Sequence, residues 1–337
     1  MNTTSVLYSR VIFFTVCLTF FIVTLGAFVR LSEAGLGCPD WPGCYGHVSV
    51  PAEHHEITAA NAAYPDKPLE AAKAWKEMIH RYFASSLGLL LVGIAISAWV
   101  IRKTYPAQQV FLPTLMVPLV MLQGAFGKWT VTLKVHPVFV TGHLIFGMTT
   151  LSLVWLMWLN QKYPIPKRAH DFKRRRLHLL AIMALSVVAL QIALGGWVST
   201  NYAAVQCGEF PGCQGQLIPD TNFREAFNLL LPIGPDYEGG RLDNIGRVTV
   251  HFAHRLGALL TFVVVSLLCF AARKHTYKPV RNSAVVLFGL LLLQISLGIS
   301  NVLFGLPLPI AVAHNGGAAL LLLGVLTLHH HLHVIGE

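Results

Sequence analysis

Charged residues are scarce in this chain of 337 residues. Asp, Glu, Lys and Arg together make up 12% of the sequence, and only 15 residues are acidic, whereas about 25% charged residues is usual in a soluble domain. Hydrophobic residues reach 54%. A soluble globule could not cover its surface with so few charges, which excludes a cytosolic enzyme and a secreted domain. The formal charge of +10 therefore indicates membrane topology, and no nucleic-acid partner is expected.

The uncharged residues form long runs, each near the roughly 20 residues that a membrane-spanning helix needs. The runs are 11–29, 82–101, 110–127, 137–160, 177–200, 256–272 and 282–334. The last run is too long for one crossing, and Pro307 and Pro309 are expected to divide it. The first run is longer than a signal peptide usually has, so we interpret it as a retained span. The sequence predicts an all-α membrane protein with eight transmembrane helices.

Lys and Arg predict the orientation of this bundle. Fourteen of them flank the side that holds both termini, against eight on the other side. The positive-inside rule then places both termini in the cytoplasm and the two long loops outside a cell membrane. Seven of the fourteen lie at 162–176, a segment that either determines topology alone or also docks on anionic lipid or a partner.

The two halves of the chain resemble each other. Leu25–Val29 recurs as Leu194–Val198, and the cysteines that follow recur at the same offset of 169. Three more landmarks recur at offsets of 171 to 174, namely His80 as His254, Gln123 as Gln294 and His143 as His314. The chain is predicted to be a duplicated four-helix unit with halves 1–165 and 166–337, related by a pseudo-twofold axis along the membrane normal. The long outer loops are 31–79 and 201–247.

Four of the six cysteines form two Cys-x5-Cys pairs, Cys38 with Cys44 and Cys207 with Cys213. On the oxidising side of a membrane such thiols tend to form disulfides. Each pair is either a staple within its loop or a redox-active dithiol that exchanges electrons with a partner or substrate. A zinc site is disfavoured because no second ligand pair follows at a suitable spacing.

Four histidines occupy equivalent places. His80, His143, His254 and His314 each lie near the predicted outer start of an even-numbered helix, within one to two turns of its end. Two histidines at one depth on neighbouring helices suit the axial positions of a haem iron. Nearby glycines are expected to let the flat ring approach the backbone, namely Gly88, Gly142, Gly257, Gly316 and Gly317. Arg81 and Arg255 follow a histidine in each half and are candidates for propionate contacts.

The repeat breaks at one position close to these histidines. Glu77 lies three residues before His80, whereas His251 holds the equivalent place before His254. A spacing of three puts both side chains on one helix face. A carboxylate beside only one site suggests that the first half performs chemistry and the second carries electrons. The alternative is that Glu77 only caps the start of its helix.

Taken together, these motifs resemble the haem A synthase family. The resemblance covers nearly the whole chain and rests on the following segments: 35–44 (GLGCPDWPGC), 77–81 (EMIHR), 141–143 (TGH), 199–204 (STNYAA), 251–255 (HFAHR) and 313–315 (AHN).

The resemblance implies that the chain oxidises the C8 methyl of haem O through successive hydroxylations to a formyl group, giving haem A for cytochrome c oxidase. It implies a substrate haem at His80 and His143, a permanent haem b at His254 and His314, and a catalytic role for Glu77. It implies a part in the reaction or in haem transfer for the first cysteine pair and a structural role for the second. The expected partners are haem O, membrane lipid, haem O synthase and an electron donor or acceptor, and a homo-oligomer is left open.

Two other functions are compatible with the residues. A di-haem b-type cytochrome that only transfers electrons explains four histidines, but not the carboxylate of Glu77. A quinone-linked disulfide oxidoreductase would use the outer cysteine pairs and needs no haem. The histidines at 329–331 and 333 are expected to have no more than incidental metal affinity.

Overall fold

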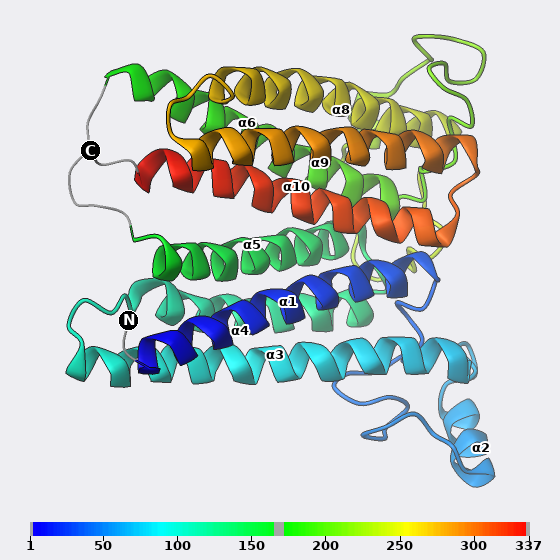
Figure 1. The fold of residues 1–337 in the computed structure, drawn as a ribbon. Helices are drawn as coiled ribbons and strands as arrows, with labels where there is room; N and C mark the ends of the chain where they lie inside the picture. The colour runs from blue at the N-terminus through cyan, green and yellow to red at the C-terminus, as the bar shows by residue number, and fades with distance from the viewer. Residues whose placement is uncertain (1–2, 165–171, 335–337) are drawn as a thin grey trace.

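The computed structural model describes residues 3–164 and 172–334, and all regular structure within these residues is helical (Figure 1). The helices are α1 (Thr3–Leu31), α2 (His54–Ala63), α3 (Ala71–Thr104), α4 (Phe111–Thr132), α5 (Pro137–Lys162), α6 (Phe172–Thr200), α7 (Phe223–Ala226), α8 (Asn244–Ala272), α9 (Lys278–Leu303) and α10 (Leu308–Val334). All but α2 and α7 are long and apolar enough to cross a membrane. The predicted eight spans of a multi-pass membrane protein are thereby confirmed.

Two spans begin earlier than predicted. Helix α3 begins at Ala71 rather than at residue 82, and α8 begins at Asn244 rather than at residue 256. Charged residues end the apolar run but do not end the helix, because a helix can continue beyond the hydrocarbon layer. His80 and His254 therefore lie between two and three turns from the start of their helices, farther from that start than the sequence predicted.

The predicted break in the last apolar run is also present. Helix α9 ends at Leu303 and α10 begins at Leu308. Gly305 and Leu306 between them have φ angles of 67° and 64°, which is the left-handed conformation that reverses the chain direction. Pro309 falls in the first turn of α10, where the missing backbone N–H is not needed.

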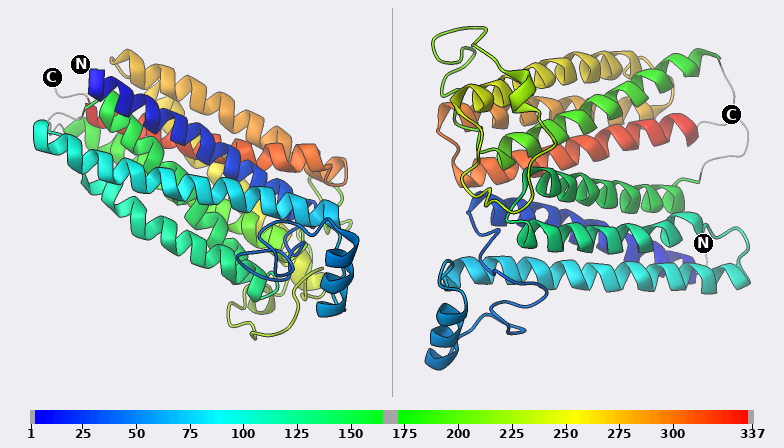
Figure 2. Two further views of the ribbon diagram at one scale, coloured as in Figure 1. Left: turned by 90° about the horizontal axis from the view of Figure 1, so that it is seen from below. Right: turned by 180° about the vertical axis from the view of Figure 1, so that it is seen from behind.

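The eight long helices pack as two groups. Helices α1, α3, α4 and α5 form one closed ring of contacts, and α6, α8, α9 and α10 form another. The groups meet where α1 contacts α10, α5 contacts α6 and α5 contacts α10 (Figures 1 and 2). The predicted boundary between residues 165 and 166 lies outside the described residues, as do Lys167 and Arg168 of the predicted basic segment.

The ends of the bundle differ in what they carry. The start of α1 and the end of α10 lie at one end, and α2, α7 and the two long loops lie at the other (Figures 1 and 2). At the loop end Arg30 of α1 reaches the second half, where it donates to the Ser199 carbonyl at 2.7 Å and lies over the Tyr202 ring. Lys67 forms an ion pair with Glu238 between the two loops. These contacts hold both loops over the same end of the bundle.

Candidate haem-binding sites

The first half brings His80 and His143 together. His80 lies on α3 and His143 on α5, both side chains are half-buried, and they are close enough for their charges to interact. The His80 ring lies against Gly26 of α1. The Gln123 amide of α4 donates to the His143 carbonyl at 3.0 Å. The four long helices of this half therefore all contribute to the surroundings of the two histidines, and their pairing at one haem iron stays a prediction.

The second half repeats the arrangement with His254 of α8 and His314 of α10. These histidines are also half-buried and close enough for their charges to interact. Gln294 of α9 donates to the His314 carbonyl at 3.0 Å, as its repeat partner Gln123 does in the first half. Gln191 of α6 donates to the His254 carbonyl at 3.0 Å, and its amide nitrogen lies 3.1 Å from His254 Nδ1.

A glycine on a neighbouring helix leaves room for each of the four rings. A Cβ atom built on that glycine would lie 3.0 to 3.3 Å from the histidine ring, closer than most side chains can approach. The pairs are Gly26 with His80, Gly127 with His143, Gly195 with His254 and Gly298 with His314. These glycines recur at the offsets of 169 and 171 that relate the two halves, so each half builds its histidine pair in the same way.

These are not the glycines that the sequence suggested. A Cβ on Gly142 would meet the Phe126 ring at 2.5 Å, and one on Gly257 would meet the Gln191 amide oxygen at 2.3 Å. Gly317 approaches the Gln294 amide in the same way. Their small size therefore serves helix packing and the placement of the glutamines, and the role in haem approach expected of them and of Gly88 and Gly316 stays a prediction.

The donor set fits a haem iron in each half. His143 Nδ1 and His314 Nδ1 are buried and have no hydrogen-bond partner among the described residues. Imidazole nitrogens are the usual axial ligands of b-type haem iron in helical bundles. The glycine-backed rings and the glutamine contacts hold these donors in place, which is what a ligand pair requires.

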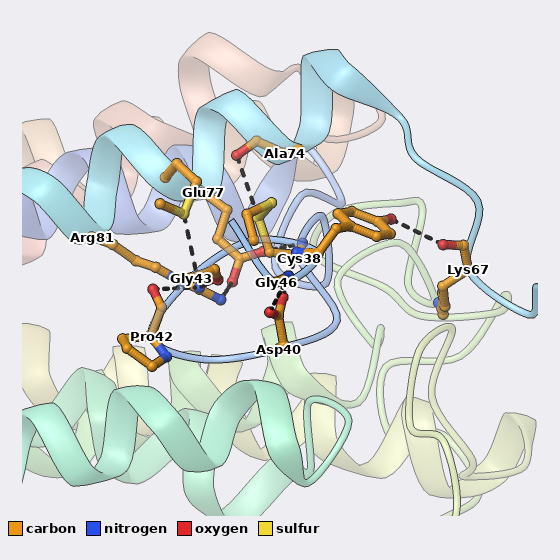
Figure 3. Close-up of a disulfide and its surroundings, with 12 residues drawn as sticks. Cys38, Asp40, Pro42, Gly43, Gly46, Lys67, Ala74, Glu77 and Arg81 are labelled. Atoms are coloured by element: carbon orange, nitrogen blue, oxygen red, sulfur yellow. Dashed lines mark hydrogen bonds and ion pairs between the residues drawn. A yellow bond between two sulfur atoms is a disulfide. The ribbon is translucent and has the colours of Figure 1, made fainter. Parts of the chain in front are cut away.

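Glu77 connects α3 to the first cysteine loop (Figure 3). Its side chain is only 5% exposed, accepts a hydrogen bond from the Cys38 backbone N–H at 2.9 Å and pairs with Arg81 at 2.5 Å. Helix α3 begins at Ala71, so Glu77 lies well inside the helix. The alternative that Glu77 caps the helix start is therefore wrong.

Both candidate propionate arginines bind the cysteine loops. Arg81 donates to the Gly43 carbonyl at 2.5 Å, and Arg255 donates to the Gly212 carbonyl at 2.7 Å. Arg81 uses its other terminal nitrogen for Glu77, whereas Arg255 uses it for the Cys207 and Glu209 carbonyls (2.8 Å each). The equivalent arginines thus differ because only the first half has a carboxylate. A propionate contact for either arginine stays a prediction.

His251, which replaces Glu77 in the second half, is also buried at 5% exposure. Its Nδ1 donates to the Ala203 carbonyl at 2.9 Å. Both residues therefore bind the backbone of the loop that follows α1 or α6, but with opposite polarity, because Glu77 accepts a hydrogen bond and His251 donates one.

The cysteine pairs form the two predicted disulfides, Cys38–Cys44 and Cys207–Cys213, with Cα–Cα distances of 4.8 and 4.6 Å. Each loop then turns back at a glycine with positive φ, Gly46 or Gly215. In the first loop Tyr45 packs inward, its hydroxyl donates to the Lys67 carbonyl, and burial raises its pKa. Whether either disulfide is redox-active stays a prediction.

Of the two free cysteines, Cys269 is buried, as a packing residue would be, and Cys17 is exposed. Cys17 lines a lateral cavity of about 750 Å³ formed by residues of α1, α5, α9 and α10. Its walls are mainly apolar, and none of the four paired histidines contributes to them. The cavity is therefore separate from both histidine pairs.

Sequence reasoning missed the parts that hold the histidines. Gln123 and Gln294 were visible as repeat landmarks, and Gly26 and Gly195 lie within the recurring segment near the end of the first helix of each half. Recurrence was the only available signal for them. No recurrence marks Gln191, because its repeat position in the first half is Ile22.

The fold and these residues define the class: a multi-pass membrane protein that carries the same histidine pair twice, each pair beside a disulfide-closed loop. Residues 9–326 match the profile of the cytochrome oxidase assembly protein family, and the chain belongs to this family. It is similar to proteins named "Heme A synthase". The one from Shewanella oneidensis is 44% identical over 94% of each chain. Those from Rhizorhabdus wittichii and Mesorhizobium japonicum are 30% and 29% identical over 94% and 92% of this chain and 91% and 86% of their own.

Proposed function

We propose that this protein is a haem A synthase, an enzyme that oxidises the C8 methyl group of haem O to a formyl group and so provides haem A for cytochrome c oxidase. The family and the relatives named "Heme A synthase" support this activity. The observation that carries it in the structure is the difference between the halves: two matching histidine pairs, of which only the first has a buried carboxylate, Glu77, one helical turn away.

The first half is the proposed site of the substrate. His80 and His143 would be the iron ligands of haem O, which fixes the position of the methyl group. Conversion of a methyl to a formyl group removes four electrons in two successive hydroxylations, and the resulting gem-diol loses water. With water as the proposed oxygen donor, each hydroxylation releases two protons and two electrons; the electrons leave towards an acceptor of the membrane, and a group near the methyl is required to accept the protons.

Glu77 is the proposed proton acceptor. It shares a helix face with His80, because the two are three residues apart, and it is shielded from water. Its partners Arg81 and the Cys38 N–H hold the carboxylate in one orientation. Arg81 also holds the loop that carries Cys38, so the geometry at Glu77 depends on the closed loop.

The second half is the proposed site of a permanent haem b, with His254 and His314 as iron ligands. Bound there, haem b would supply a path for the electrons that leave the substrate, towards an acceptor of the membrane. Gln191 and Gln294 would hold the two ligands. His251 gives this half no carboxylate, which suits electron transfer without proton abstraction.

The proposed arrangement in the membrane completes this function. Both halves would be related by a pseudo-twofold axis along the membrane normal. The mirrored contacts of α1 with α10 and of α6 with α5 support such an axis. With both termini cytoplasmic, the disulfide loops would lie on the outer side. Haem O synthase would supply the substrate, and surrounding lipid, an electron partner and a second copy of the chain are further proposed partners.

Extraction and identification of the haems in the purified protein tests this function. We expect haem b together with haem O, its hydroxylated form or haem A. The His80→Ala variant should retain haem b and lose the others, and His254→Ala should lose haem b. Haem b alone in the wild-type protein, at two per chain, would instead identify a di-haem electron-transfer cytochrome. A colourless protein would indicate the disulfide oxidoreductase.

A further inference from the structure

A run of histidines ends helix α10, at the end of the bundle opposite the disulfide loops (Figure 1). Two of them bind neighbouring side chains. His330 Nε2 contacts the Asn160 side-chain oxygen at 3.1 Å, and His331 Nδ1 contacts the Ser283 hydroxyl at 2.9 Å. The other two, His329 and His333, are one helical turn apart and lie on a different face.

His329 and His333 face His178 of α6. The ring centroids of His178 and His333 are 4.3 Å apart, those of His329 and His333 are 4.6 Å apart, and those of His178 and His329 are 5.6 Å apart. One ring nitrogen from each of the three lies within 4.8 Å of the other two. Three imidazoles from two helices therefore converge on one point.

Local contacts orient these rings for metal binding. His333 donates from Nδ1 to the His329 carbonyl at 3.0 Å, so its Nε2 carries the lone pair. Such a bond from the second ring nitrogen is the usual way in which proteins orient a histidine ligand. His329 is half-buried and its Nδ1 has no hydrogen-bond partner among the described residues.

We propose that His178, His329 and His333 bind one transition-metal ion of borderline softness, such as Zn²⁺ or Cu²⁺. Neutral imidazoles suit these ions and disfavour Mg²⁺ and Ca²⁺, which prefer oxygen ligands. Tetrahedral coordination at Zn–N bonds of about 2.0–2.1 Å separates the ligand atoms by about 3.3 Å. Small torsion changes of the three side chains would bring their nitrogens from within 4.8 Å to this separation, and three protein ligands leave one position for water.

This site is separate from the histidine pairs. His329 lies about 22 Å along α10 from His314, at 1.5 Å per residue. The metal would cross-link α6 and α10, which both belong to the second half and are joined through α8 and α9. We infer that it stabilises this end of the second half. It does not take part in haem oxidation.

Zn²⁺ binding to the haem-loaded protein without a polyhistidine tag tests the proposal. In detergent, competition with a chromophoric chelator should reveal one Zn²⁺ per chain that is lost in the His329→Ala/His333→Ala double variant. Each single variant should weaken Zn²⁺ binding at least about tenfold, because even the loss of an outer-shell contact to a metal ligand weakens metal binding by about that factor. His330→Ala and His331→Ala are matched controls from the same helical run, and they should bind Zn²⁺ as the wild type does.

A second measurement identifies the ligands. Bound Cu²⁺ should show electron paramagnetic resonance couplings to imidazole nitrogens that disappear in the double variant. The haem absorption spectrum reports whether each variant is folded. If a variant loses this spectrum, His333→Gln is measured in its place, because it changes an exposed side chain. The proposal is wrong if no Zn²⁺ binds at micromolar concentration, or if the His330 and His331 variants weaken binding as much as the others.

Discussion

The carboxylate of Glu77 lies 2.9 Å from the backbone nitrogen of Cys38 and so joins helix α3 directly to the first disulfide. The corresponding residue in the second half, His251, instead donates to the Ala203 carbonyl. The group proposed to accept protons and the first cysteine loop are therefore one structural unit. Among the residues that the structure describes, no carboxylate bonds the backbone N–H of a cysteine of the second disulfide, which predicts different consequences when the two disulfides are changed.

Replacement of Glu77 by Gln keeps the size of the side chain and an oxygen for the Cys38 N–H, but it removes the negative charge beside Arg81. We expect haem O to remain bound and the formation of haem A to fall about 10²–10⁴-fold, the usual contribution of a general acid or base. Chromatography of the extracted haems measures both quantities. Full haem A formation in this variant would refute the proposed role.

Replacement of both cysteines of a pair by serine separates the structural role of that disulfide from a role in the reaction. Each disulfide closes a short ring, so we expect either change to lower the free energy of unfolding by about 2 kcal/mol. Only Cys38→Ser/Cys44→Ser should also reduce haem A formation, because only this loop positions Glu77. Denaturant unfolding and haem extraction are the two measurements. Equal losses of activity in both double variants would contradict the proposed asymmetry.

Alanine at the glycines behind the histidine rings tests the two haem sites separately. A Cβ at Gly26 would lie 3.0 Å from His80 Nε2, and one at Gly195 would lie 3.2 Å from His254 Cε1. Overpacking of this kind costs roughly 1–3 kcal/mol, so we expect each change to weaken haem retention in its own half about tenfold. Gly93→Ala is the control, because nothing lies within 4 Å of a Cβ there. Loss of both haems from one variant would show that the sites are not independent.

The sequence picked out the candidate ligands and the candidate proton acceptor, but not the residues that contact them in the fold. The four histidines were recognisable because they recur at equivalent places in the two halves, Glu77 because it breaks that repeat, and the disulfides because of the cysteine spacing. The start of α3 was misplaced by eleven residues, because the prediction followed charge and the helix does not. Contacts such as Gly26 with His80 depend on how helices rotate against each other, which periodicity alone does not define.

The start of α2 should be sensitive to acid. The backbone N–H groups of Ala52 and Glu53 donate to the Glu56 carboxylate, which lowers the pKa of this exposed group below its ordinary value. The stabilisation that the Glu56 carboxylate provides is therefore complete above its pKa in the unfolded chain, about 4.3. This stabilisation is lost as the pH falls through the pKa of Glu56 in the folded protein. The protection of the Glu53 amide against exchange should fall as the pH falls through this lowered pKa. Glu56→Ala should exchange fast at every pH, and an unchanged acid response in that variant would contradict the assignment.

Gln191 should affect haem b alone, since the first half has Ile22 at the equivalent position. Replacement by Leu removes the hydrogen bond to the His254 carbonyl and the amide next to the His254 ring. Loss of such an outer contact to a metal ligand typically weakens metal binding 10–100-fold, so we expect haem b to be retained less well and its reduction potential to shift. Gln123→Leu is the comparison in the first half, because Gln123 donates in the same way to the His143 carbonyl; it should weaken haem O binding and leave the potential of haem b unchanged. Spectroscopic redox titration distinguishes the two variants, and an unaltered haem b in Gln191→Leu would show that this amide does not support His254.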